Sequence, residues 1–473
     1  MSKPGTASES VNDRHSALNP TIVARRIEPR CIDAVVLAVK QARERGQPLA
    51  IAGARHAMGG QQFLSGGTLL DMCSLNRVRR FDGERGLIEV EAGITWPDVM
   101  RGYLVPQAGL PQAWGIRQKQ TGADRLTIGG AISANIHGRG LAAQPFAADV
   151  QSIELVTTQG EVVRCSREHR RELFRRVLGG YGLFGIITAA TLRLVPRQKV
   201  ERVVRIIDLE ELMMAFGERI AAGFLYGDFQ FSTASGSDAF LRTGVLSCYR
   251  AVDSQRPVPR EQRRLSLADW NRLLLLAHKD KSAAFERFAS FYKATSGQLY
   301  WSDTHQLNIY LEDYHGELDR RLGARIPGSE MITELYVPRS RLVAFMDDVR
   351  RDFLQHGTNF IYGTIRLIEK DTESALPWAP ESWACVIFNL HVDHRVEDID
   401  RAAAAFRRLI DHAIAHQGSY YLTYHRYARA DQVATCHPGM RDFLRAKGQA
   451  DPEGILQSDW YCHMRSLLAT APA

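Results

Sequence analysis

Two glycine-rich turns, about 70 residues apart, constrain this 473-residue chain more than any other feature. The first, IAGARHAMGGQQ, covers residues 51–62, and the second, QKQTGADRLTIGGAISANIHGRG, covers residues 118–140. Each follows strand-like sequence and each holds a histidine, His56 or His137. Glycine lets a ligand approach the backbone, and successive N–H groups in such turns bind anions. The pair predicts a pyrophosphate-binding site that is neither a Rossmann fingerprint nor a P-loop; the alternative is two tight structural turns.

Length and charge bound the class of protein. A chain of this length is too long to fold around one ordinary hydrophobic core, so two lobes are expected. Hydrophobic residues make up 45% and charged residues 24%, which is typical of globular proteins. The net charge of +7 is spread along the chain, and its short basic runs are mixed with acidic or apolar residues. We interpret these runs as solvated faces and expect no nucleic-acid partner.

The cysteines and the N-terminus indicate the compartment. Seven scattered cysteines, with no CxxC pair, argue against a disulfide framework and favour a reducing cytoplasm. Residues 1–20 are polar and lack the apolar region of a signal peptide, so we expect a flexible tail. No apolar run approaches the ~20 residues that a membrane helix needs.

The order of element types divides the rest of the chain and predicts an α+β fold. Residues 21–197 mix short strands with helices, including an amphipathic helix over 31–46 that ends at a glycine. Residues 198–414 hold longer alternating strands with helices between them, which indicates an antiparallel sheet with one face covered by helices. Residues 415–473 return to short elements, and we expect them to pack on the first unit and close its site.

Four segments in fixed order carry a resemblance to a known family. They are GARHAMGGQQ, TIGGAISANIHGRG, LGGYGLFGIITAATLRLVP and SYYLTYH. Together they resemble the flavoproteins of the vanillyl-alcohol oxidase and p-cresol methylhydroxylase (PCMH) family. The similarity is greatest to the branch of alditol oxidases, sugar-lactone oxidases and decaprenylphosphoryl-ribose oxidase. It is clearest over residues 20–197 and 418–463, and it implies a two-lobe fold with a PCMH-type FAD-binding domain.

The resemblance implies where FAD binds. His56 matches a histidine that bonds covalently to the flavin in many members, and a neutral imidazole in a rigid turn is a suitable nucleophile. The alternative is an imidazole that only packs against the ring. A second linkage through cysteine is not expected, because no cysteine lies between Cys73 and Cys165. The FAD-binding residues that the resemblance implies are Gly53, Ala54, Arg55, His56, Ala57, Met58, Gly59, Gln61, Gly122, Thr127, Ile128, Gly129, Gly130, Ala134, Asn135, His137, Ile187 and Tyr421. For His137 a purely structural role stays open.

Strands of the second unit each have one apolar and one polar face, because side chains at i and i+2 share a face. Water could solvate the polar face, but the resemblance implies that this sheet roofs the flavin. A polar roof suits a hydroxylated substrate. The substrate-binding candidates are Asp228, Gln230, Tyr336, Tyr362, Thr364 and Asn389.

The general base is left open by the sequence. Oxidation of an alcohol requires loss of the O–H proton, which a base within hydrogen-bonding reach assists. Tyr424 stands where ribose-oxidase-like relatives have a lysine, and Arg366 could lower its pKa. The catalytic candidates are Tyr424, His425, His391, Arg366 and Glu334. We expect no metal at His391 and His394, because their spacing puts them on opposite faces of a strand.

These observations predict an FAD-dependent enzyme that oxidises a CH–OH group of a polyol, sugar or nucleoside-like molecule. Hydride moves to flavin N5, and O2 is the expected electron acceptor; the alternative is another acceptor, because the family also contains dehydrogenases. One alternative is oxidation of a C–N or benzylic C–H bond. An alternative of another class is a flavin-binding protein without catalysis. We expect a monomer or homodimer.

Overall fold

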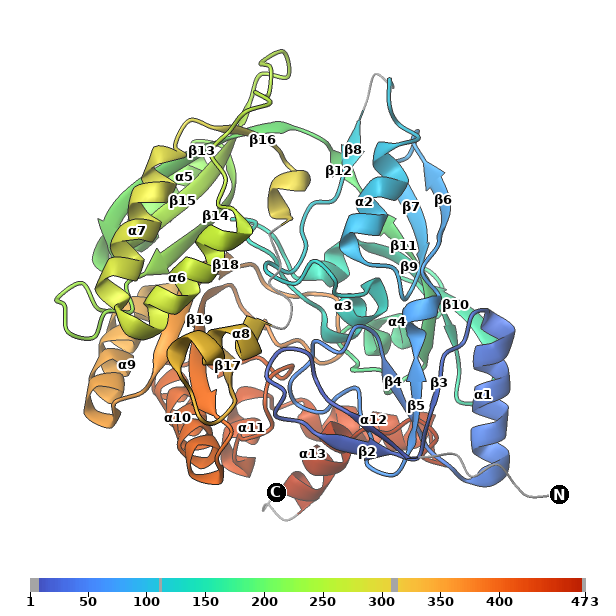
Figure 1. Ribbon diagram of the computed structural model, residues 1–473. Helices are drawn as coiled ribbons and strands as arrows, with labels where there is room; N and C mark the ends of the chain where they lie inside the picture. Colours follow the sequence, from blue (N-terminus) through green and yellow to red (C-terminus); the bar gives the residue numbers. More distant parts are fainter. Residues whose placement is uncertain (1–7, 110–112, 308–313, 470–473) are drawn as a thin grey trace.

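Two sheets form the first lobe of the computed structural model, which describes residues 8–109, 113–307 and 314–469 (Figure 1). The parallel sheet has the order β3 (Arg25–Ile27), β5 (Thr68–Asp71), β4 (Leu49–Ala52). The antiparallel sheet has the order β10 (Val162–Ser166), β9 (Val150–Val156), β11 (Ile186–Arg193), β7 (Leu87–Glu91), β6 (Val78–Asp82). The helices of this lobe are α1 (Ile32–Arg45), α2 (Trp96–Leu104), α3 (Ile128–Ala134) and α4 (Arg171–Val177).

Local signals explain two of these elements. α1 buries Val35 and Val39 and ends at Gly46, which adopts the left-handed conformation with φ +60°, so the predicted helix is confirmed. β9 and β10 form an antiparallel hairpin, with Gly160 at φ +81° in its turn.

The prediction of a flexible tail over residues 1–20 is wrong for the described residues from 8 onward. β1 (Glu9–Val11) pairs with β2 (Thr21–Val23), and the segment between them is held by hydrogen bonds to the buried Asp13 carboxylate. The Asn19 side chain donates to the carbonyl of Met58 at 2.7 Å. The polar composition predicted that these residues would be exposed to solvent, but their polar groups form hydrogen bonds with one another instead. Residues 1–7 lie outside the described part.

An eight-stranded antiparallel sheet forms the second lobe. Its order is β16 (Leu299–Trp301), β13 (Lys199–Asp208), β15 (Thr243–Val252), β14 (Phe224–Phe231), β18 (Phe360–Ile368), β19 (Trp383–Asp393), β17 (Gly328–Pro338), β20 (Ser419–Tyr420). A two-stranded link, β8 (Trp114–Gly115) with β12 (Val195–Pro196), lies at the junction of the lobes. The α+β fold with a second antiparallel-sheet domain is thereby confirmed.

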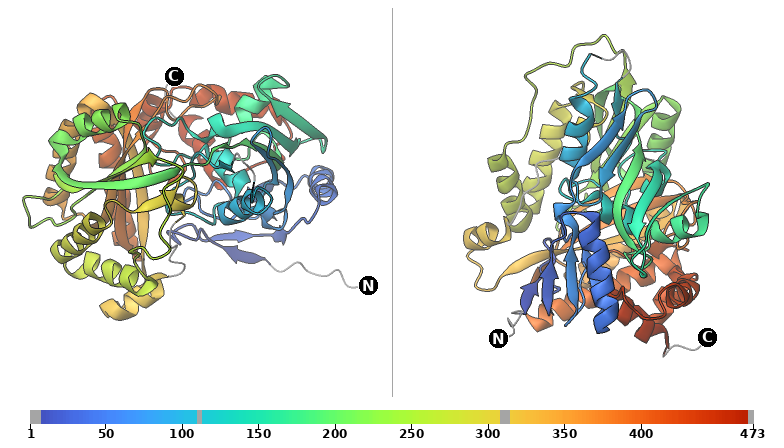
Figure 2. Two further views of the ribbon diagram at one scale, coloured as in Figure 1. Left: turned by 90° about the horizontal axis from the view of Figure 1, so that it is seen from above. Right: turned by 90° about the vertical axis from the view of Figure 1, so that its right-hand side faces the viewer.

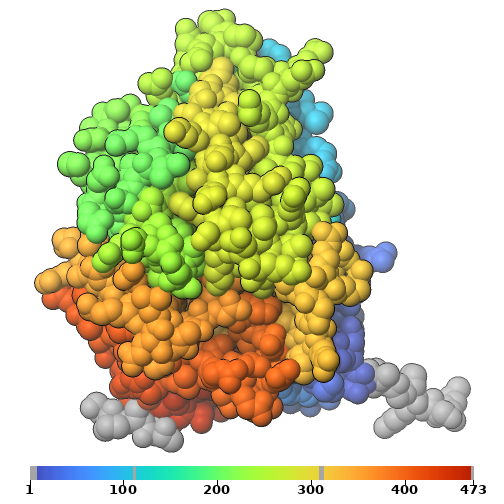
Figure 3. Space-filling view, turned by 60° about the vertical axis from the view of Figure 1, so that its left-hand side comes forward, coloured from blue at the N-terminus to red at the C-terminus, as the bar shows by residue number. Residues whose placement is uncertain are grey.

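Helices pack on both faces of the large sheet, whereas the sequence predicted one covered face. One face carries α5 (Leu209–Ala221), α9 (Leu342–His356) and α10 (Val396–Ala415), and Phe353 of α9 packs against Phe388 of β19. The other face is partly covered by α6 (Leu267–Lys279), α7 (Lys281–Ala294) and α8 (Tyr314–Leu322). Figure 2 shows the sheet between these layers, and in Figure 3 the residues of α6 to α8 form a continuous outer surface.

The C-terminal segment returns to the first lobe. It holds α11 (Ala430–Cys436), α12 (Met440–Ala450) and α13 (Asp459–Ala469), drawn in red beneath the blue strands in Figure 1. Leu49 of β4 donates to the carbonyl of Ile455 at 2.7 Å and accepts from the amide of Gln457 at 2.9 Å. These bonds extend the edge of the parallel sheet with the end of the chain.

Two further properties concern the whole described chain. All seven cysteines are free thiols. None of the helices in the described ranges has the length and apolar content needed to cross a membrane.

Candidate active site

A cavity of about 420 Å³ lies between the lobes. Its lining from the first lobe and the C-terminal segment includes residues 53–58, Gln61, Gly122, Thr127, Gly129, Gly130, Ala134, Ile187, Tyr421 and Tyr424. Its lining from the large sheet includes Asp228, Gln230, Ser247, Ile332, Tyr362, Arg366, Ile387 and Asn389. The structure therefore brings both glycine turns and most of the predicted polar roof to one cavity.

The first glycine turn starts where β4 ends at Ala52, and it needs glycine at two positions. A Cβ on Gly53 would lie 2.1 Å from Oγ1 of Thr127. A Cβ on Gly59 would lie 2.3 Å from the carbonyl oxygen of Tyr424. Both distances are shorter than any normal contact, so only glycine lets this turn touch the second turn and the C-terminal segment.

The same turn leaves backbone N–H groups open to a ligand. Among the described residues, the amides of Ala54, Arg55 and Ala57 have no hydrogen-bond acceptor. Arg55 adopts φ +61°, a left-handed conformation that reorients the chain here. Three open amides beside a glycine backbone fit the pyrophosphate of FAD.

The second turn brings its backbone to the cavity in a similar way. Thr127 caps α3, and its Oγ1 accepts from the amide of Gly130 at 3.3 Å. A Cβ on Gly129 would lie 3.0 Å from Cβ of Ala92, which is tighter than normal packing. Gly122 adopts φ +78° where the loop bends. The small residues therefore let the helix end approach both the neighbouring strand and the cavity.

The C-terminal segment is tied across the cavity by two side chains. Gln61 accepts from the amide of Gly59 at 2.9 Å and donates to the carbonyl of Leu422 at 2.7 Å. The hydroxyl of Tyr421 donates to the carbonyl of Ala134 at 2.6 Å. These bonds fix the position of the residues that follow, including Tyr424.

His56 lies in the cavity wall beside His15, which comes from the N-terminal segment. Burial lowers the pKa of His56 to about 4, so its imidazole is neutral at physiological pH. A neutral imidazole has the lone pair that a covalent bond to a flavin requires. His15 was missed by the sequence prediction, because its segment was interpreted as a tail.

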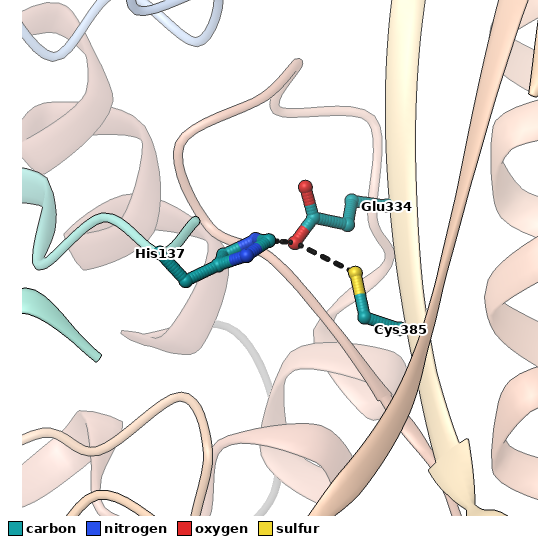
Figure 4. Close-up of side chains that lie close together, drawn as sticks. All are labelled: His137, Glu334 and Cys385. Carbon is teal, nitrogen blue, oxygen red and sulfur yellow. Dashed lines mark hydrogen bonds and ion pairs between the residues drawn. The ribbon is translucent and has the colours of Figure 1, made fainter. Parts of the chain in front are cut away.

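The buried carboxylate of Glu334 lies beside His137 and Cys385 (Figure 4). Oε1 of Glu334 lies 2.6 Å from Nε2 of His137, accepts from the hydroxyl of Tyr336, and lies 3.4 Å from Sγ of Cys385. Oε2 accepts from the hydroxyl of Tyr424 at 3.1 Å. Glu334 is 1% exposed, so Tyr424, which lines the cavity, is its link to a ligand.

The protonation states of this pair follow from its surroundings. Burial alone would raise the pKa of Glu334, but His137 and the hydrogen bond from Tyr336 hold it below its usual value. Burial and the Glu334 charge raise the pKa of Tyr424 well above its usual value. Arg366 does lower the pKa of Tyr424, as expected, but burial and the Glu334 charge outweigh its effect. Glu334 is the ionised member and Tyr424 the protonated one.

Several residues of the sheet that line the cavity carry buried polar atoms without hydrogen-bond partners. Within the described residues, no hydrogen-bond partner is found for Nε and Nη1 of Arg366, Oδ1 of Asn389 or Oγ of Ser247. All three residues line the cavity, and Arg366 is only 3% exposed. Buried polar groups without partners are costly, so these groups are suited to hydrogen-bond a polar ligand.

Aromatic side chains form a second, apolar part of the same cavity. Trp270 of α6 and Phe288 and Tyr292 of α7 line it beside Val245 of β15. None of these aromatic residues is among the site residues predicted from the sequence. Arg139, at the end of the second glycine motif, also lines the cavity, and its Nη1 lies 4.0 Å from Oδ2 of Asp228.

Several predicted site residues lie elsewhere. His425 is buried against the ring of Tyr427 and does not line the cavity, and His391 lies in a separate cluster around Glu330. Among the predicted contacts, those outside the cavity lining are Gly59, Ile128, Asn135, His137, Tyr336 and Thr364. Asn135 instead bonds the Asp371 side chain at 3.0 Å. The side chains of Asn135, His137 and Tyr336 form hydrogen bonds with protein groups instead.

Comparison with known proteins agrees with this geometry. Residues 23–166 match the family model described as an FAD binding domain. Decaprenylphosphoryl-beta-D-ribose oxidase of Mycolicibacterium smegmatis is 25% identical over 448 residues, which cover 90% of this chain and 91% of that protein. Cytokinin dehydrogenase 4 of Oryza sativa subsp. japonica is 28% identical, covering 74% of this chain and 69% of that protein. Cytokinin dehydrogenase 1 of Arabidopsis thaliana is 35% identical, covering 34% of this chain and 27% of that protein.

The fold, the two glycine turns at the cavity and these similarities define an FAD-binding oxidoreductase. The match over residues 23–166 and these similarities support the family that the motifs predicted, FAD-linked oxidoreductases with a PCMH-type FAD-binding domain.

Proposed function

We propose that this enzyme oxidises a CH–OH carbon of a hydroxylated substrate such as a polyol, a sugar or a sugar-derived molecule. The observation that carries the proposal is the set of unpaired polar groups on the sheet above the FAD cradle. Arg366, Asn389 and Ser247 offer both donors and acceptors to hydroxyl groups. Similarity to a ribose oxidase over 90% of the chain supports the same substrate class.

The substrate proton leaves through Tyr424 and Glu334. The hydroxyl of Tyr424 accepts the O–H proton of the substrate while its own proton moves to Oε2 of Glu334, 3.1 Å away. His137 and Tyr336 hold the other carboxylate oxygen, which keeps Glu334 ionised and oriented before the reaction. FAD, when bound, supplies the hydride acceptor. Arg366 stabilises negative charge that develops on the substrate oxygen.

We also propose that His56 attaches FAD covalently. Its position in the cavity wall and its neutral imidazole support this role, and the glycine turn around it fixes the ring in one place. O2 as electron acceptor, a monomeric or homodimeric assembly and a cytoplasmic location are further parts of the proposal. The seven free thiols support the location.

A second candidate reaction is oxidation of a C–N bond. The similarity to a cytokinin dehydrogenase over 74% of the chain favours it. Tyr424 and Glu334 could accept an N–H proton as well as an O–H proton. The polar side chains of the sheet distinguish an alcohol from an amine substrate. A planar, mostly apolar amine would leave Arg366 and Asn389 without hydrogen-bond partners in the complex.

Anaerobic bleaching of the flavin tests the proposal. The purified holoenzyme is mixed with polyols, aldoses, sugar phosphates and, separately, secondary amines. Bleaching by a hydroxylated compound, with KM raised at least about tenfold by Arg366→Met or Asn389→Leu, supports the proposal. His169→Ala, an exposed position in the first lobe, serves as control. Bleaching by amines alone would overturn the proposed substrate class.

A further inference from the structure

A second cluster of ligand-type side chains lies apart from the flavin cavity. It joins His278 of α6, Glu330 of β17 and His391 of β19, none of which lines that cavity. Glu330 is fully buried, and it lies four residues before Glu334 on the same strand. The proposed oxidation uses none of these three groups.

The three ligand atoms have the spacing of a tetrahedral metal site. Oε1 of Glu330 lies 3.8 Å from Nε2 of His278 and 3.6 Å from Nδ1 of His391, and all three atoms lie within 4.8 Å of one another. Tetrahedral zinc with bonds of about 2.0–2.1 Å separates its ligands by about 3.4 Å. The cluster at Glu334 differs, because its 2.6 Å contact between His137 and Glu334 leaves no room for an ion.

The same three atoms make only long ion-pair contacts with one another, whereas the second oxygen of Glu330 and the second nitrogen of His391 have other partners. Within the described residues, Nε2 of His278, Nδ1 of His391 and Oε1 of Glu330 are buried and make no hydrogen bond. Oε2 of Glu330 accepts from Tyr314, and Nε2 of His391 lies 3.4 Å from Oδ1 of Asp393. A carboxylate behind a metal-binding histidine is the usual second contact of such sites. The three possible ligand atoms therefore lie close together without hydrogen bonds.

We propose that His278, Glu330 and His391 bind a zinc-type divalent cation, with water in the fourth position. Two histidines and one carboxylate are a common zinc ligand set. The ion links α6 to the large sheet. Because Trp270 of the same helix lines the flavin cavity, the ion also fixes the aromatic end of that cavity.

Metal content and cobalt spectroscopy of the flavin-loaded protein test this proposal. We expect one zinc per chain after purification with zinc and dialysis, and a visible Co2+ spectrum of tetrahedral intensity after exchange. His278→Cys should keep the ion and add a thiolate-to-cobalt charge-transfer band, which arises only if residue 278 is a ligand. Asp393→Asn should weaken zinc binding about 10- to 100-fold. His356→Gln, an exposed histidine on α9, should leave metal binding unchanged.

Two results would overturn the proposal. One is a wild-type holoenzyme that retains no zinc and gives no tetrahedral cobalt spectrum at micromolar metal, which would leave an ion pair between His391 and Glu330. The other is a normal cobalt spectrum in His278→Cys without the charge-transfer band. Flavin absorbance and circular dichroism show that each variant is folded, and neither depends on the identity of the oxidised substrate.

Discussion

The hydroxyl of Tyr424 donates a hydrogen bond to Oε2 of Glu334 at 3.1 Å, which connects the cavity to a carboxylate that solvent does not reach. Neither residue is a suitable base alone. Tyr424 has a raised pKa, and Glu334 does not line the cavity. Together they provide an ionised acceptor and a path to it.

Removing either member of this pair should slow flavin reduction. We expect Tyr424→Phe and Glu334→Gln each to lower the anaerobic reduction rate by about 10²- to 10⁴-fold, because each breaks the proton path. Stopped-flow absorbance of the flavin measures this rate. Tyr427→Phe is the matched control, since Tyr427 does not line the cavity. A normal rate in Tyr424→Phe would contradict the proposed route.

The pH profile should distinguish Glu334 from a histidine base. Because the pKa of Glu334 is held below its usual value, the wild-type reduction rate should stay constant from pH 8 down to about pH 5. A histidine base with an ordinary pKa would instead lose activity below about pH 6.5. Stopped-flow rates across this range decide between the two.

Acid precipitation tests the covalent bond to His56. Flavin should stay with the wild-type polypeptide after denaturation and should be released from His56→Ala, because the imidazole is the attacking nucleophile. The fluorescence of the pellet and supernatant measures this. His169→Ala should behave as wild type. Intact FAD in the supernatant of the wild type would contradict the covalent bond, and the protein would then be an enzyme that binds FAD non-covalently.

Gly53→Ala should reduce FAD content strongly. The new Cβ would lie 2.1 Å from Oγ1 of Thr127, so the two glycine turns must move apart. Gly217→Ala in α5 is the matched control, because its Cβ meets nothing within 4 Å and the change should stabilise the helix by about 0.5–1 kcal/mol. The flavin-to-protein absorbance ratio after gel filtration measures the loss. Equal flavin-to-protein ratios in the two variants would contradict the role of the Gly53 turn in FAD binding.

Asp352 on α9 should contribute stability that depends on pH. Burial alone would raise its pKa, but hydrogen bonds from His412 and Arg408 on α10 hold the pKa at about 2. A lowered carboxyl pKa stabilises the fold above the unfolded value of about 4, and the contribution is lost as pH falls toward 2. Asp352→Asn should therefore cost about 1–2 kcal/mol at pH 7, after allowance for solvent around Arg408, and about half that at pH 3. Denaturant unfolding at the two pH values measures the difference, and an equal cost at both would refute it.

Short-range sequence signals predicted much of the fold. The spacing of Val35 and Val39 with Gly46 predicted α1, and the alternation that begins near Asn389 in residues 383–393 predicted β19 with Asn389 on the polar face. Both signals are local, because they depend on helical period, strand period and glycine conformation. The polar N-terminal segment had no such period, and its fold depends on hydrogen bonds to Asp13.

By itself, the sequence indicated the cofactor class through its resemblance to a flavoprotein family, and it located the two glycine turns, where a side chain would clash, as at Gly53. Only the tertiary structure decided which polar side chains act together. Glu334 and Tyr424 form a hydrogen bond although they lie 90 residues apart in the sequence, and His278 and His391 come from separate elements. Strand register and helix placement set these distances through packing of the whole core, and no local pattern encodes them.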